Sequence, residues 1–143
     1  MRGTLLNTRA ADNDVTIQPD GRTEKYRGET TRDNPAYIIR FAEMYLIRAE
    51  AKGRSMGLND LNIIRNKRGI ASLTAGNTAT DDAFINAVLN ERRAEFNFEG
   101  HRFFDLARTD KATSVLGVAA FRKILPIPGR EVSAAGLKQN PQY

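Results

Sequence analysis

Three glutamates, Glu91, Glu95 and Glu99, are spaced four residues apart and are the first candidates for a catalytic role. On a helix, side chains four residues apart lie on one side, so the three carboxylates would form a row. Because glycoside hydrolysis uses a pair of carboxylates, a glycosidase that uses Glu91 or Glu95 is one hypothesis. Glycosidase carboxylates flank the bond that they cleave, however, whereas a row on one helix points one way. We therefore expect the row to form structural ion pairs. Its candidate partners are Arg40, Arg65, Arg68 and Arg102.

Arg92 lies on the apolar side of the same predicted helix, three residues after Leu89 and four residues before Phe96. A charge on a buried helix side is costly unless an opposite charge meets it. The sequence therefore predicts that Arg92 is at least partly buried and paired with a carboxylate. Glu43 and Glu50, on an earlier predicted helix, are the natural partners.

His101 is the only histidine, and the chain has no cysteine. A zinc site built from several histidines, a cysteine-histidine dyad and a disulfide are therefore excluded. Asp105 follows His101 by four residues, but no nucleophile-elbow motif supplies a serine for a Ser-His-Asp arrangement. Glycine-rich phosphate-binding motifs are also absent. We expect structural roles for His101 and Asp105, no cofactor, and no enzymatic activity.

Aromatic and basic residues give little support for other ligands. Tyr26 and Tyr37 are weak candidates for a ligand platform, and the chain has no tryptophan. The net charge of +5 arises from basic residues interspersed with acidic ones. Nucleic-acid binding would need a clustered basic stripe with interleaved aromatic residues, so we do not expect it.

Apolar periodicity predicts the elements that carry these residues. Between residues 36 and 54, apolar residues recur at helical spacing. The stripe consists of Ile38, Phe41, Ala42, Tyr45, Leu46 and Ala49. Gly53 and Gly57 predict a break, and a second helical run then extends to Gly69. Together the two runs predict an antiparallel hairpin of the tetratricopeptide type.

Further helices are expected downstream. Thr80 predicts the start of a third helix, Gly100 its break, and residues 101–108 a short additional helix. Residues 125–129, with two prolines, are expected to be non-helical, and residues 137–143 to form an extended tail. The fold class is thus mainly α. Residues 1–35 form a predicted loop-rich lead with at most a short β-hairpin, and residues 36–143 a helical domain that is part of a larger protein.

Five segments of the chain resemble motifs of the SusD/RagB family, in the family's order. The longest, residues 91–106, reads ERRAEFNFEGHRFFDL and is close to the family consensus. Residues 40–51 and 61–69 resemble two earlier helical motifs, and residues 125–128 and 139–143 resemble the family's ending. Five motifs in the expected order are far more specific than any one of them.

The resemblance implies a surface-exposed lipoprotein of the outer membrane that binds a nutrient, most often a glycan, without catalysis. It would deliver this ligand to a SusC-like TonB-dependent transporter. Its lipid anchor would lie outside this cysteine-free sequence, as would most ligand contacts, so none can be assigned to a residue here. The motifs themselves would be structural, with ion pairs formed by Arg40, Glu43, Glu50, Arg65, Glu91, Arg92, Glu95, Glu99, Arg102 and Asp105. The alternative is a free-standing tetratricopeptide-like module that binds a protein partner.

Overall fold

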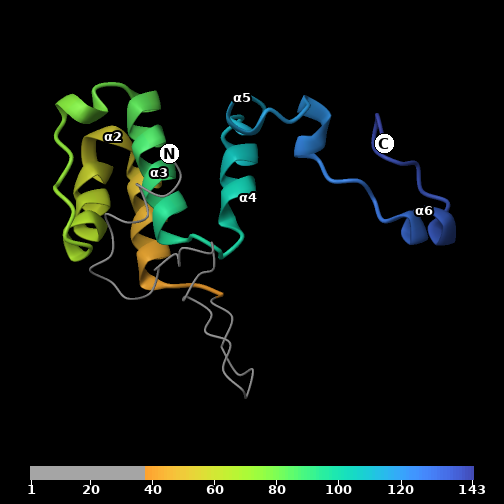
Figure 1. The fold of residues 1–143 in the computed structure, drawn as a ribbon, viewed down its shortest axis with the longest axis horizontal. Helices are drawn as coiled ribbons and strands as arrows, with labels where there is room; N and C mark the ends of the chain where they lie inside the picture. The colour runs from red at the N-terminus through yellow and green to blue at the C-terminus, as the bar shows by residue number, and fades with distance from the viewer. Residues whose placement is uncertain (1–37) are drawn as a thin grey trace, which may run out of the picture. The chain divides into compact units, whose positions relative to one another are not determined.

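A computed structural model of the chain describes residues 38–143. Helices joined by turns and loops make up these residues, and no strand occurs between residues 38 and 143 (Figure 1). The predicted mainly α fold class is therefore confirmed. The loop-rich lead predicted for residues 1–35, and the two candidate tyrosines Tyr26 and Tyr37, lie outside the described residues.

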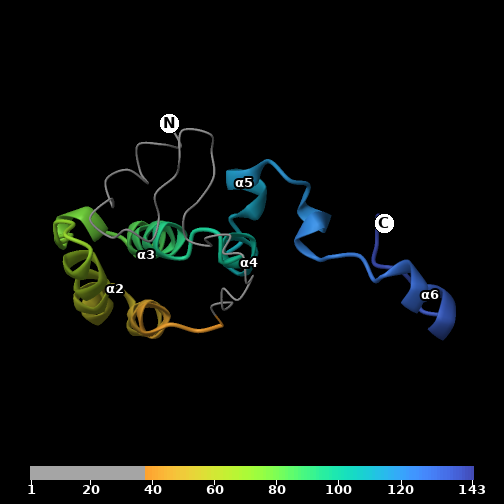
Figure 2. The ribbon, with the colours of Figure 1, turned by 60° about the horizontal axis from the view of Figure 1, so that its bottom comes forward.

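Helix α2 (Phe41–Lys67) is a hairpin of two helical halves, residues 41–52 and 54–67. The backbone turns back at Gly53, whose φ of 67° and ψ of −176° are non-helical. Almost no residue other than glycine adopts this combination of angles. The two halves lie side by side (Figures 1 and 2), as expected for the predicted antiparallel hairpin.

The start of α2 differs from the prediction. The helix begins at Phe41 and not near residue 36, because Arg40 is extended, with φ −131° and ψ 155°. Ile38 therefore precedes the helix and is 87% exposed, and Phe41 is 86% exposed, although both were expected on the buried stripe. The buried side of the first half is narrower and consists of Ala42, Leu46 and Ala49.

Gly57 does not break the helix, contrary to the prediction. It lies inside the second half of α2 and is buried where the two halves approach each other. A Cβ atom at this position would lie 2.0 Å from the Ala49 carbonyl oxygen and 2.9 Å from Cζ of Phe84. Gly57 is therefore required by close packing and not by a turn.

A loop leads from α2 to helix α3 (Asp81–Glu95) through the 3₁₀ turn η2 (Gly76–Thr78). The Asn62 side chain holds this loop, since its amide nitrogen donates to the Leu73 carbonyl (2.9 Å) and its oxygen accepts from the Leu73 amide (2.8 Å). Thr80 caps α3, with its hydroxyl oxygen accepting from the Ala83 amide at 3.1 Å. The predicted cap is thus confirmed.

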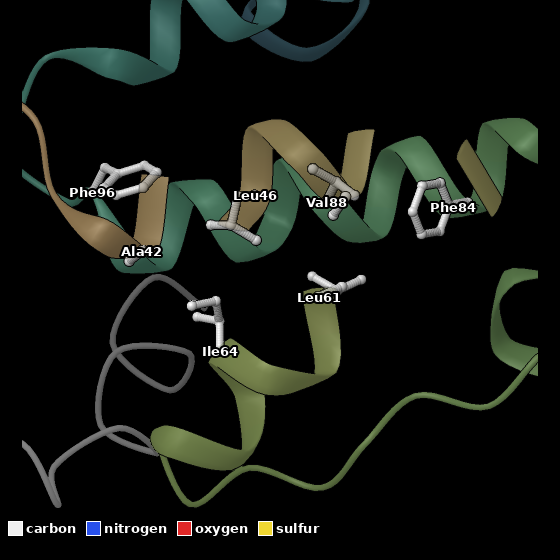
Figure 3. Packing of buried hydrophobic residues seen from close by; sticks show 8 residues of the cluster. Ala42, Leu46, Leu61, Ile64, Phe84, Val88 and Phe96 are labelled. Atoms are coloured by element: carbon white, nitrogen blue, oxygen red, sulfur yellow. The ribbon is translucent and has the colours of Figure 1, made fainter. Parts of the chain in front are cut away.

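The core of this part of the chain lies between the α2 hairpin and α3 (Figure 3). Leu46 comes from the first half of α2, Leu61 from the second half, and Phe84 and Val88 from α3. Each is at most 1% exposed. At about 1.5–3 kcal/mol for each large apolar side chain removed from water, this burial is what holds the three helical segments together.

The chain divides after Arg102 into two compact units. Helix α4 (His101–Arg108) has the predicted bounds. The second unit, residues 103–143, continues with α5 (Ala112–Leu116), the 3₁₀ turn η3 (Ala120–Lys123) and α6 (Gly129–Ala135). The sequence did not predict these short elements, and α6 begins at Gly129, inside the stretch expected to be non-helical.

The two family-like segments near the C-terminus contact each other within the second unit. The Gln139 side chain accepts from the Ile127 amide and donates to the Ile127 carbonyl, both at 2.8 Å. Asn140 donates to the Leu125 carbonyl (2.7 Å), and the Tyr143 hydroxyl donates to the Ile124 carbonyl (3.0 Å). The closing segment therefore satisfies the backbone groups of a proline-rich stretch that cannot form a helix.

Candidate functional site

The three glutamates of the row are all buried, with side chains 3% exposed. Glu91 and Glu95 lie on α3, but α3 ends at Glu95, so Glu99 belongs to the turn before α4. A continuous helical row of three carboxylates, as the spacing predicted, is therefore not formed. The carboxylates nevertheless share arginine partners, and we call Arg40, Arg65, Arg68 and the three glutamates the Arg–Glu network.

Glu95 is the centre of the Arg–Glu network. Arg68, from the end of α2, donates to both carboxylate oxygens, through Nε at 3.0 Å and Nη2 at 2.7 Å. Arg40, just before α2, donates through Nη1 to Oε1 of Glu95 at 2.9 Å. A bidentate contact, such as that between Arg68 and Glu95, is the strongest form of a guanidinium-carboxylate pair. Glu95 thus joins both ends of the α2 hairpin to α3.

Arg40 and Arg65 extend the network. The Arg40 Nη2 atom donates to Glu99 Oε1 and to the Glu95 backbone carbonyl, both at 2.8 Å. That carbonyl is among the last four of α3, which have no partner within the helix, so Arg40 also caps α3. Arg65 donates to Glu91 at 3.0 Å and to the Ala71 carbonyl at 2.9 Å. Every glutamate of the row therefore has a guanidinium partner.

Arg92, which is also on α3, is 5% exposed. Its Nη2 atom is 3.6 Å from Oε1 of Glu43, and Nδ1 of His101 is 3.6 Å from the same oxygen. The guanidinium carbons of Arg92 and Arg40 lie 5.0 and 5.1 Å from the centre of the Phe96 ring. Cations at this distance from an aromatic ring are attracted to it. The structure thus places Arg92 in the environment that the sequence predicted.

The electrostatics of the network do not suit acid catalysis. Burial alone would raise the pKa of the Glu95 carboxyl, but hydrogen bonds from Arg68 and Arg40 outweigh burial and lower the pKa below its usual value. Burial would lower the pKa of Arg40, and its bonds to Glu99 and Glu95 raise it instead. A glycosidase acid needs the opposite shift, a raised carboxyl pKa. What this arrangement favours is a permanently charged, hydrogen-bonded network.

A second cluster, formed by Arg48, Lys52 and Asp60, was not predicted. Asp60 is 2% exposed and accepts from Arg48 Nε (2.9 Å), Arg48 Nη2 (2.7 Å) and Lys52 Nζ (2.9 Å). The hydrogen bond from Arg48 lowers the pKa of Asp60, burial raises it, and the hydrogen bond from Lys52 lowers it further. The resulting pKa of Asp60 is about 2. Because these residues come from opposite halves of α2, the cluster fastens the hairpin. Because Asp60 is separated from Arg48 and Lys52 by the turn at Gly53, the sequence alone does not show that the three are neighbours. Predicting this cluster would have required the correct register of the hairpin.

Arg102, Glu50 and Asp105 are the other residues that were predicted to form ion pairs. Arg102 donates to the Leu89 carbonyl at 3.4 Å, and Glu50 is partly buried on α2. Asp105 is buried in the second unit and accepts from Arg108 Nε at 3.1 Å and Nη2 at 2.9 Å. Among residues 38–143 no three acidic or histidine side chains are grouped as metal ligands would be. No helix in the described part of the chain has the length and apolarity to cross a membrane.

Comparison with known proteins identifies the class to which this helical, ion-paired region belongs. The sequence profile of the SusD family, SusD_RagB, matches residues 15–120. The chain therefore belongs to the SusD family. A curated relative, SusD-like protein P38 of Formosa agariphila, is 31% identical over 116 residues, which cover 71% of this chain and 23% of the relative.

A solved structure is similar as well. It is titled a laminarin binding SusD-like protein, and it is 38% identical to this chain with a TM-score of 0.64. The match covers 76% of this chain and 23% of the solved chain. The chain thus spans about a quarter of the length of both relatives. Below, "the full-length protein" means the whole product of the gene that encodes these residues.

Proposed function

We propose that the full-length protein is a non-catalytic glycan-binding protein of the outer membrane, exposed at the cell surface. It delivers its ligand to a SusC-like TonB-dependent transporter, and a lipid anchor attaches it to the membrane. Membership of the SusD family supports this proposal. The laminarin binding relative, at 38% identity, makes laminarin the first glycan to test.

The contacts of Glu91 and Glu95 carry the non-catalytic part of the proposal. Both carboxylates are buried and bonded to arginines, so neither is placed to protonate a leaving group or attack a sugar. The role that fits them is structural, in holding α2 to α3. In this proposal the glycan contacts come from parts of the full-length protein other than the Arg–Glu network.

Titration calorimetry of the full-length protein with laminarin oligosaccharides, after a glycan-array screen, tests the proposal. We expect saturable binding of at least one glycan and no release of new reducing ends on long incubation. Hydrolysis that disappears in Glu91→Gln or Glu95→Gln would instead establish a glycosidase. Failure to bind any glycan, together with capture of a peptide, would favour the alternative of a tetratricopeptide-like module.

Delivery to a transporter needs a separate experiment. The full-length protein, purified from its native membrane in mild detergent, should bring with it a TonB-dependent transporter. Proteolysis of intact cells should remove the protein if it is exposed at the surface. A protein that resists proteolysis until the cells are lysed would contradict the proposed location.

A further inference from the structure

Phe98, in the turn between α3 and α4, has a φ of 64°, which lies in the left-handed region. This conformation is strained for a bulky residue, because its Cβ atom approaches the following carbonyl oxygen. The other non-glycine residues with positive φ between residues 38 and 143 are Asp110 and Gln142, which have polar side chains. The Phe98 side chain has no polar atom that could offset the strain through a local hydrogen bond.

Contacts on both sides of Phe98 fix the turn. Phe96 is 3% exposed in the core, and the His101 ring lies 4.8 Å from its ring. The Glu99 amide donates to the Phe96 carbonyl at 3.1 Å, which closes the turn around Phe98. The Glu99 side chain is 3% exposed and accepts from Arg40, through Nη2 at 2.8 Å and Nε at 3.4 Å. The two neighbours of the strained backbone are therefore held by tertiary contacts.

The Arg40–Glu99 contact and a relaxed Phe98 are incompatible. An unstrained helical φ is about −63°, so relaxation would rotate the backbone at Phe98 by roughly 127°. A rotation of this size redirects the chain that follows, and the Glu99 carboxylate would move away from Arg40. Strained backbone angles persist only where the surrounding structure holds them in place.

We propose that the Arg40–Glu99 ion pair holds the turn in its strained conformation at Phe98, and that the turn relaxes when this pair is lost. Arg40 then does more than join helices, because it also sets the backbone of a turn that is distant in sequence. The proposal concerns the fold and holds whichever ligand the full-length protein binds.

Comparing alanine with glycine at position 98 tests the strain. Both substitutions remove the aromatic ring, but only alanine keeps the Cβ atom that makes a positive φ costly. In urea unfolding of the full-length protein, we expect the unfolding equilibrium constant of Phe98→Ala to exceed that of Phe98→Gly by at least about fivefold. A Phe98→Ala variant as stable as Phe98→Gly, or more stable, would overturn the proposal.

The matched control is the same pair of substitutions at Arg93, an exposed position within α3. At an ordinary helical position alanine is favoured over glycine, so the order of the two variants should be the opposite of that at position 98. Glycine favoured at both positions would overturn the proposal, because the effect would then not depend on a positive φ.

Repeating the comparison at position 98 in a Glu99→Ala background tests the role of the ion pair. Arg40 retains its contacts with Glu95 in this background, and only the contact with Glu99 is lost. We expect the advantage of glycine over alanine to vanish or reverse, because the released turn no longer needs a positive φ. An advantage that stays at fivefold or more would overturn the proposal.

Arg40→Lys provides a second background if Glu99→Ala does not fold. Lysine keeps the positive charge, but its single nitrogen replaces the separate guanidinium nitrogens that reach Glu95 and Glu99. The advantage of Phe98→Gly over Phe98→Ala should again shrink. An advantage as large as in the wild-type background would contradict the holding role of Arg40.

Discussion

The Arg40 guanidinium contacts Glu95 twice across 55 residues of sequence, donating to its carboxylate at 2.9 Å and to its backbone carbonyl at 2.8 Å. One side chain thus both neutralises a buried charge and caps helix α3. Together with Arg68, which also donates to Glu95, it ties the beginning and end of the α2 hairpin to α3. The charges of the family-like motifs are therefore used to join helices.

Removing Arg40 should destabilise the fold strongly. Arg40→Gln leaves the carboxylates of Glu95 and Glu99 buried with fewer donors, and breaking a buried ion pair by removing one partner costs about 3–5 kcal/mol. Urea unfolding of the full-length protein, followed by circular dichroism, measures the loss. The matched control is Arg54→Gln, which breaks the exposed contact with Asp81 and should cost at most about 1 kcal/mol. Equal effects of the two substitutions would contradict a structural role for the network.

Gly57→Ala should be among the most damaging small substitutions. The added methyl group would lie 2.0 Å from the Ala49 carbonyl oxygen, so the two halves of α2 must move apart. We expect a loss of about 3 kcal/mol or more in the free energy of unfolding, at the upper end of overpacking costs. Gly76→Ala is the control, because its nearest neighbouring atom is 3.6 Å away, and it should be nearly neutral. A stable Gly57→Ala variant would show that the halves of α2 do not pack this closely.

The Asp60 cluster should make stability depend on acid pH. The pKa of Asp60 falls from 3.8 to about 2 on folding, so the folded state holds its proton less tightly than the unfolded state does. Its contribution is therefore fully present above pH 3.8 and is lost as the pH falls through about 2. The difference in unfolding free energy between the wild type and Asp60→Asn should be constant near neutral pH and shrink across this window. A difference that grows on acidification would have the wrong sign.

Gln139 should protect the backbone amide of Ile127 from exchange with solvent. Gln139→Ala removes both hydrogen bonds to Ile127, which has the only backbone N–H between Pro126 and Pro128. Because each net hydrogen bond contributes about 0.5–1.5 kcal/mol, the Ile127 amide should exchange with solvent roughly tenfold or more faster. Hydrogen exchange measured by NMR or by peptide mass spectrometry reports this change. Lys138→Ala, at an exposed position, should leave the rate unchanged, and an unaffected Ile127 in the Gln139 variant would refute the contact.

Local signals account for what could be predicted from the sequence. Thr80 indicated the start of α3 because its hydroxyl satisfies a free backbone amide. Gly100 was predicted to end the same helix, but α3 already ends at Glu95, and Gly100 with φ 81° lies at the end of the turn before α4. The placement of Arg92 followed from its position on an apolar stripe, since burial of a charge there requires a nearby carboxylate.

Contacts between distant segments account for most of what could not be predicted. Gly57 resembles a helix breaker in sequence, and only the approach of Ala49 gives it a packing role. The cluster of Arg48, Lys52 and Asp60 depends on the register of the α2 hairpin. The hydrogen bond between Gln139 and Ile127 depends on how the chain folds back over the residues between them. The short helices α5 and α6 are too brief for apolar periodicity to distinguish them from loops.

Measuring stability and glycan affinity together in Glu95→Gln of the full-length protein tests whether the Arg–Glu network serves the fold and not the ligand. We expect the free energy of unfolding to fall by about 3–5 kcal/mol, while the affinity for the glycan, measured where the variant is still folded, stays within about twofold of the wild type. A variant that unfolds like the wild type but has lost glycan binding would contradict a structural role, because Glu95 would then serve the ligand and not the fold.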